Sequence, residues 1–168
     1  MVNQLQREFT TKQIEDSLGL KANTLHYYIH SGAITPGIET GTGTRRLLSA
    51  TNYVEAVIIR QLMKFGVPKR TIINMFRSID NANERDSLNP SRQLKKESDV
   101  SQLEEVEYLV FFLSHDDFNP GGISHKFVLG GTGELEEYLF RKTECIVINL
   151  KNSVAIFMAH LLMGKNLK

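Results

Sequence analysis

The fold of the first half of the chain is decided by one stretch, Thr24-Leu25-His26-Tyr27-Tyr28, with Gly32 four residues further on. Leu25, Tyr28 and Ile29 recur at helical spacing, and Gly32 offers the left-handed residue that ends a helix, so the pattern predicts a helix over about residues 22–31. The other face of this helix is expected to carry polar and aromatic side chains, namely Asn23, Thr24, His26, Tyr27 and His30. One side therefore suits a core and the other suits solvent or a ligand.

A shorter helix is predicted just before it. Thr10 can cap this helix, Gln13 can reach back to the cap, and Phe9 can pack on Ile14 as a hydrophobic staple, until Gly19 stops it. Two short helices around a glycine turn, the second with a polar and aromatic outward face, are typical of a helix-turn-helix. The second helix of that motif fits the major groove of DNA.

Residues 34–47 have the composition of a β-hairpin, with Pro36 and glycines at the bends and Arg45 and Arg46 on the returning strand. The two arginines could form an ordinary solvated hairpin face. Beside a helix-turn-helix, however, we expect them to meet DNA phosphates.

Two further helices complete this unit. Ser49 can cap the third helix, with Leu48 able to staple to Tyr53, and Gly66 ends it, while Pro68 fits the first turn of the fourth. Positions expected to face the core recur at helical spacing in both: Val54, Val57, Ile58, Gln61, Leu62 and Phe65 in the third, and Ile72, Met75, Phe76 and Ile79 in the fourth.

Residues 9 to 79 resemble the MerR family of winged helix-turn-helix transcription regulators. The likeness rests on Thr24-Leu25-His26-Tyr27-Tyr28, the Gly32 turn, Arg46-Leu47-Leu48-Ser49 and Lys64-Phe65-Gly66-Val67-Pro68. The resemblance implies that the second helix lies in the major groove, and that the wing and the last two helices hold the phosphate backbone. It also implies bacterial regulators that distort promoter DNA to aid or block RNA polymerase.

The chain departs from the family at several positions. Family members commonly have arginine where this chain has Asn23 and His26. It also has Lys21 in place of a small cap residue and Arg45 in place of an aromatic in the wing. Asn prefers adenine and Arg prefers guanine in direct readout, so the preferred operator should differ from the usual one.

Helical geometry separates the two tyrosines of the motif. Tyr28 is expected in the core, whereas Tyr27 lies with Asn23 on the opposite side and is expected to touch phosphate or sugar. The residues expected to contact DNA are Thr11, Lys12, Asn23, Thr24, His26, Tyr27, His30, Thr44, Arg45, Arg46, Lys64 and Lys69.

Charge is distributed unevenly along the chain. Residues 1–80 hold 10 Lys+Arg against 6 Asp+Glu, a net +4, and residues 81–168 hold 10 against 13, a net −3, which together give the +1 of the whole chain. The basic excess lies with the predicted DNA reader, but it is modest. A homodimer on two adjacent half-sites is therefore expected.

Composition divides the 168 residues into a winged helix-turn-helix domain over residues 1–80, a polar linker over residues 81–102 and a small α/β domain over residues 103–168. The fold class is α+β. The linker contains no aromatic residue, and a helical turn near Arg92 to Glu97 is left open.

The second domain is expected to serve dimerisation or to bind a small-molecule effector. Apolar runs predict strands over residues 106–113 and 145–150, with a third over residues 125–129 and a helix over residues 134–142. Residues 152–163 form a helix that is apolar nearly all round, so it must be buried, either in its own chain or against a second subunit, where the family commonly places a C-terminal helix.

Several other features point away from membranes and redox chemistry. Met1 to Glu8 is polar, and the apolar run from Cys145 to Met163 is interrupted by polar residues, which predicts a soluble, cytoplasmic protein with no membrane partner. The single Cys145 excludes an intrachain disulfide and is expected to be a buried small hydrophobe.

Neither a cofactor nor a metal is expected. The glycine loop Leu129-Gly130-Gly131-Thr132-Gly133-Glu134 does not complete a nucleotide fingerprint, and its acidic helix start would repel phosphate, so a tight turn is favoured. His26 and His30 are four apart on a helix but lack a third ligand nearby. The group His115, Asp116, Asp117 and His125 surrounds what looks like an exposed loop.

These patterns predict a non-enzymatic, sequence-specific regulator that binds double-stranded promoter DNA as a homodimer. The alternative is a protein-interaction adaptor that uses the winged unit as a docking surface, which the modest charge and the missing family arginines would suit.

Overall fold

The computed structural model describes residues 8–36, 47–79, 82–90, 107–113, 123–129 and 145–163. It is a mixture of helices and strands, as predicted, with the N-terminal part mainly helical. The C-terminal part is a small sheet with a helix.

The predicted helix-turn-helix is confirmed as α2 (Thr11–Leu18) and α3 (Ala22–His30). At the start of α2 the backbone N–H of Gln13 donates to the Thr10 hydroxyl at 3.2 Å, and the backbone N–H of Thr10 donates to Gln13 Oε1 at 2.9 Å. Gly19 ends α2 with a φ of 62°, a conformation that glycine adopts without strain.

A short two-stranded sheet precedes the next helix. Strand β1 (Phe9–Thr10) pairs antiparallel with β2 (Leu47–Leu48), so the entry to α2 is tied to the entry to the third helix. The hairpin was expected over residues 34–47, and its residues 37–46 lie outside the described residues.

The third and fourth helices are α4 (Ala50–Lys64) and α5 (Lys69–Ser78). Ser49 and Asn52 form the capping box of α4, and Pro68 stands at the N-cap of α5, one residue before its first turn. The apolar stripe predicted for α5 is buried in full, but Phe65, which was expected on the core face of α4, is 85% exposed. That prediction was wrong because α4 ends at Lys64, so Phe65 already belongs to the turn that Gly66 completes.

The segment that follows was expected to be linker from residue 81, yet residues 82–90 are folded against the helices. They form α6 (Ala82–Arg85) and a 3-10 turn η1 (Asp86–Leu88), and Leu88 is fully enclosed in the core. The residues near 92–97 lie outside the described residues.

All three predicted strands are present as one antiparallel sheet in the order β4-β3-β5, made of β3 (Glu107–Leu113), β4 (Ile123–Leu129) and β5 (Cys145–Asn149). Strand β3 is central, with Val110 opposite both Lys126 and Val147. The helix expected over residues 134–142 lies outside the described residues.

The last helix, α9 (Leu150–Met163), follows β5 directly. Val154 and Phe157 on α9 are buried, and the Phe157 ring meets the rings of Tyr53 at 5.0 Å and Phe9 at 5.9 Å. These side chains are therefore buried in their own chain, which was one of the two alternatives for this helix.

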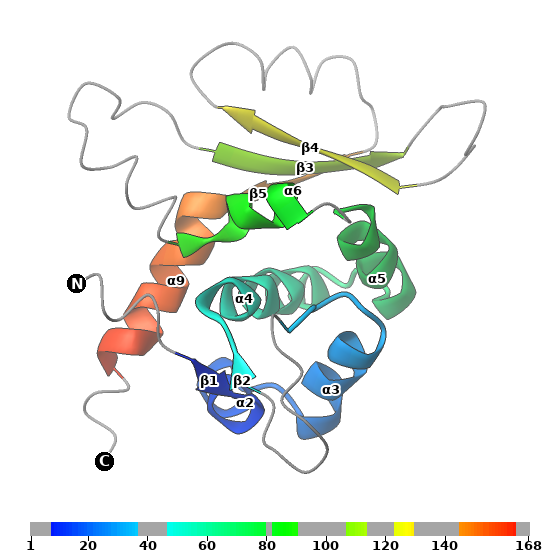
Figure 1. Ribbon diagram of the computed structural model, residues 1–168. Coiled ribbons are helices and arrows are strands. Elements are labelled where there is room, and N and C mark those ends of the chain that lie inside the picture. Colours follow the sequence, from blue (N-terminus) through cyan, green and yellow to red (C-terminus); the bar gives the residue numbers. More distant parts are fainter. Residues whose placement is uncertain are drawn as a thin grey trace, which may run out of the picture.

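Helix α4 lies across the middle of the molecule, with α2 and α3 on one side and the three-stranded sheet on the other (Figure 1). Helices α9 and α5 stand near its two ends. One hydrophobic cluster contains residues of both halves, including Ile14 and Tyr28 from the helix-turn-helix and Phe111 and Ile148 from the sheet. The packing of the described residues is thus continuous from α3 to the sheet.

Candidate nucleic-acid interface

The outward face of α3 is exposed, as predicted, at four of its five expected positions. Asn23, His26 and His30 are exposed, and Tyr27 is 45% exposed. Thr24 is different, because only 9% of its surface is exposed. It lies four residues before Tyr28, so helical geometry places it on the same side as the core residues, and its assignment to the outward face was wrong.

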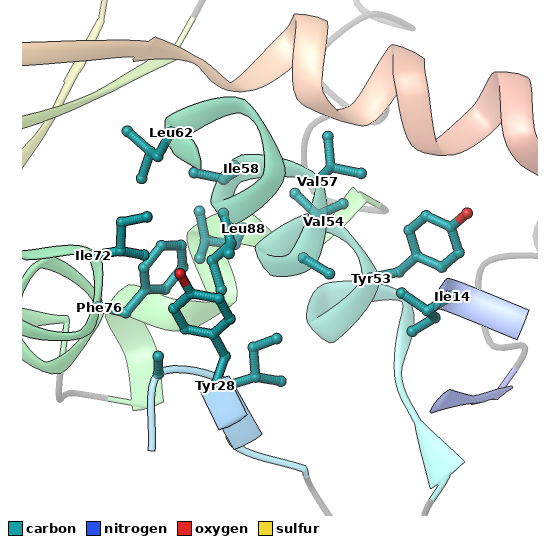
Figure 2. Close-up of a cluster of buried hydrophobic side chains, with 14 of the residues drawn as sticks. Ile14, Tyr28, Tyr53, Val54, Val57, Ile58, Leu62, Ile72, Phe76 and Leu88 are labelled. Atoms are coloured by element: carbon teal, nitrogen blue, oxygen red, sulfur yellow. The ribbon is translucent and has the colours of Figure 1, made fainter. Parts of the chain in front are cut away.

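Tyr28 anchors α3 in the core. Its ring reaches from α3 toward Phe76 of α5, in the same cluster as Leu88 (Figure 2). Burial raises the pKa of the Tyr28 hydroxyl, so this side chain stays neutral and serves packing. The neighbouring Tyr27 ring remains on the outer face, at an edge-to-face contact of 5.5 Å with Tyr28.

The C-terminal end of α3 is closed by hydrogen bonds from its own backbone and from α5. The N–H of Ser31 donates to the Tyr27 carbonyl at 2.9 Å, and the N–H of Ala33 donates to the Tyr28 carbonyl at 3.0 Å. Arg77 Nε on α5 donates to the Ser31 carbonyl at 3.0 Å. These contacts fix the angle at which α3 leaves the core, and hence the face that it presents.

A cation–π contact joins α3 to the start of α5. Lys69 Nζ lies 5.6 Å from the centroid of the Tyr27 ring. Lys69 is exposed, and Lys64 and Phe65 are exposed in the turn just before it. We call the exposed side chains of α3, together with the exposed lysines that flank the α4–α5 turn, the reading surface: Asn23, His26, Tyr27, His30, Lys64 and Lys69.

A buried carboxylate lies beneath the reading surface. Glu15 on α2 is 5% exposed, and its Oε1 has no hydrogen-bond partner among the described residues. His26 on α3 lies close to this carboxyl group, with its Nε2 3.9 Å from Glu15 Oε1. Sequence reasoning did not single out Glu15, although Ile14, Glu15 and Leu18 share one helical face and their spacing could have identified it.

Two other predicted contact residues lie on α2. Thr11 is half-buried, whereas Lys12 is exposed and its Nζ is 2.7 Å from Asp16 Oδ1. The hydrogen bond to Asp16 raises the pKa of Lys12. Thr44, Arg45 and Arg46 lie outside the described residues.

In the described part of the chain, no group of three or more His, Cys, Asp or Glu side chains is placed to hold a metal ion. His125, which was considered as a ligand, instead contacts Ser78 and Glu84. Cys145 is half-buried and not enclosed as expected. Residues 114–120 and 130–144, which contain the other candidate ligands and the glycine loop, lie outside the described residues.

Within the described ranges, none of the helices has the length and apolar character needed to cross a membrane.

The fold and the reading surface define a helix-turn-helix of the DNA-binding type. Residues 9–79 match the family model described as MerR HTH family regulatory protein. The N-terminal part of the chain is therefore a MerR-type helix-turn-helix domain, of a family of DNA-binding transcription regulators. A search of curated proteins finds no match to this chain.

Proposed function

We propose that the protein is a sequence-specific transcription regulator that binds promoter DNA as a homodimer. The observation that carries the proposal is the exposed face of α3, where Asn23, His26 and Tyr27 stand on a helix whose opposite side is locked into the core through Tyr28. A rigid helix with hydrogen-bonding side chains on its outer face is the structure that reads base edges in a major groove.

The reading surface divides into two kinds of contact. Asn23 and His26 are the proposed contacts to base edges, since both are exposed on α3, and an Asn amide pairs best with adenine. Tyr27, Lys64 and Lys69 lie beside them and suit sugar and phosphate, as do Arg45 and Arg46 in the wing. Base contacts determine which sequence is bound, and phosphate contacts determine how tightly any duplex is held.

The basic excess of residues 1–80 is modest, so one copy supplies few phosphate contacts and should bind DNA weakly. This supports a homodimer. Two copies would read two half-sites separated by about one helical turn or a multiple of it. In this role the protein works in the bacterial cytoplasm, with RNA polymerase as its partner at the promoter. The C-terminal sheet and α9 would form the dimer or take a small-molecule effector.

Replacing Asn23 or His26 with alanine is expected to change which sequence is preferred, because each removes a base contact. Losing one good base contact costs about 1–3 kcal/mol of discrimination at one position. Selection from randomised duplexes with wild type and both variants measures this. A variant that keeps the wild-type preference would show that its side chain does not read DNA.

Replacing Lys69 with alanine is expected to weaken binding to all sequences alike. The slope of log affinity against log salt should become shallower by about one, because one phosphate contact is lost. Lys151, an exposed lysine on α9, offers a matched control, and its change to alanine should leave the slope unchanged. An unchanged slope for Lys69→Ala would remove this residue from the reading surface.

One observation favours a second candidate, the protein-interaction adaptor. Phe65 is 85% exposed in the α4–α5 turn, and an exposed aromatic suits a protein partner. An adaptor would lose activity with Phe65→Ser and keep it with Arg45→Ala and Arg46→Ala combined. A DNA-binding regulator gives the reverse result when expression from its own promoter is measured.

A further inference from the structure

Helix α6 lies beyond the matched domain, yet its last two residues contact opposite parts of the molecule. Arg85 reaches down to the helix-turn-helix, and Glu84 reaches the C-terminal sheet. In Figure 1, α6 lies between the sheet and α4.

All the hydrogen bonds that Arg85 donates go to residues of the N-terminal helical part, which carries α3. Its Nε donates to the carbonyl of Ile79 at 2.8 Å, and its Nη2 donates to the carbonyls of Phe76 at 3.2 Å and Gly32 at 3.3 Å. Its Nη1 donates to Glu55 Oε1 at 2.9 Å and to the carbonyl of Ala33 at 3.4 Å. A guanidinium has five N–H donors, so these five bonds leave none unused. Arg85 thus joins the end of α3 to α4 and α5, and is a positioning residue for the reading helix.

Glu84 is held by His125 from the edge strand β4. His125 Nε2 is 3.2 Å from Glu84 Oε2, and His125 Nδ1 is 3.2 Å from Ser78 Oγ on α5. The single hydroxyl proton of Ser78 goes to the carbonyl of Met75 at 2.7 Å, so Ser78 Oγ must accept from His125. The Glu84 carboxylate also accepts. Both ring nitrogens therefore donate only when the imidazole is protonated.

The surroundings of His125 oppose that protonated state. Burial lowers the pKa of His125, and the Glu84 carboxylate raises it by less. The rings of Phe111 on β3 and Phe127 on β4 lie 6.5 and 5.8 Å from the His125 ring. Glu84 on α6 is the only charged group paired with His125 among the described residues, and α5 contributes the neutral Ser78. Near neutral pH the imidazole is neutral and one of its two contacts lacks a donor, and because its pKa is lowered in the fold, proton uptake works against this arrangement.

We propose that α6 couples the C-terminal sheet to the reading helix, with His125 holding Glu84 from the sheet side and Arg85 holding the end of α3. This inference rests on the proposed DNA-binding function and names how that site is regulated. An event that moves β4, such as proton uptake at His125 or ligand binding to the sheet, shifts α6 and loosens the end of α3.

Two variants and a matched control test the coupling. In His125→Gln one side-chain amide replaces the ring that contacts both Glu84 and Ser78, and Glu84→Gln keeps the shape of the contact but removes the charge. His160→Gln is the control, because His160 Nδ1 on α9 also joins the two halves, through the Tyr53 hydroxyl at 3.1 Å, but does not touch α6. Thermal melts first establish that each full-length variant is folded.

Hydrogen exchange of the amides of Gly32, Ala33 and Ile34, whose N–H groups close the end of α3, reports the coupling without DNA. At about pH 7.5, where the imidazole is neutral, we expect about fivefold faster exchange and about fivefold weaker DNA binding in both test variants than in wild type. The difference from wild type should shrink as the pH falls toward about 5, because proton uptake at His125 loosens the wild-type contact as well. His160→Gln should match wild type in both measurements.

The outcomes separate the two claims. If His125→Gln and Glu84→Gln exchange as His160→Gln does, the coupling is wrong whatever happens with DNA. If exchange rises but DNA affinity stays at the wild-type value, the contact serves stability alone and the regulatory claim is overturned. If wild type prefers no DNA sequence, the proposed function fails, and the exchange data still decide whether α6 links the two halves.

Discussion

Above about pH 7, where Glu55 is ionised, replacing Arg85 with methionine is expected to lower the free energy of unfolding by about 3–5 kcal/mol, the usual cost of removing one partner from a buried ion pair. Methionine fills similar space but donates no hydrogen bonds. The change leaves the buried Glu55 carboxyl without its guanidinium, and four backbone carbonyls lose the hydrogen bond that Arg85 donates.

Chemical denaturation of wild type and variant measures the effect. Arg77→Met is the matched control, because Arg77 is an exposed arginine with a hydrogen bond to the same turn, and its loss should cost about 1 kcal/mol. Arg85→Lys keeps the charge with fewer donors and should fall between the two. A loss of less than about 1 kcal/mol for Arg85→Met would show that Arg85 does not organise the end of α3.

Glu55 should make the stability of the protein depend on pH. Its carboxyl is fully buried on α4, and burial raises its pKa to about 7, although the Arg85 charge and the hydrogen bonds from Asn52 and Arg85 lower it. A raised pKa means that the folded state binds the proton more tightly than the unfolded state. The stabilisation is therefore complete below the ordinary value of 4.5 and is lost as pH rises toward about 7.

The pH dependence is isolated by comparison with Glu55→Gln, which cannot titrate. Between about pH 4.5 and pH 7.5, wild type should lose roughly 3 kcal/mol of stability relative to Glu55→Gln. His125 and His160 titrate in both proteins and cancel in the difference. The same change at exposed Glu8 is a control. A constant difference between wild type and Glu55→Gln across this range would show that Glu55 is ionised in the fold throughout.

Much of the N-terminal fold could be predicted because its signals are local. Thr10 with Gln13, the glycines that follow α2, α3 and α4, and the spacing of apolar residues on α5 all act within a few residues, and each was confirmed. The pairing of Phe9 with Leu48 was missed because it joins residues far apart in the sequence. Helix α6 was missed for the same reason, since its polar sequence is held by contacts with distant residues.

The candidate nucleic-acid interface also has one part that local signals predict and another part that depends on contacts between distant residues. The exposure of Asn23, His26 and Tyr27 follows from helical periodicity, and periodicity applied to Thr24 also explains why that residue is buried. The groups that support this face could not be predicted. Arg85 and His125 owe their roles to carbonyls and carboxylates that only the tertiary fold brings near.

The central claim is that α3 reads DNA sequence. The most direct test titrates the full-length protein onto a duplex covering the region upstream of its own gene, and onto a shuffled duplex of the same composition, at several salt concentrations. The account predicts a preference of roughly a thousandfold or more for the upstream duplex, and log affinity that falls linearly with log salt on both. Equal affinity for the two duplexes, or no dependence on salt, would contradict it.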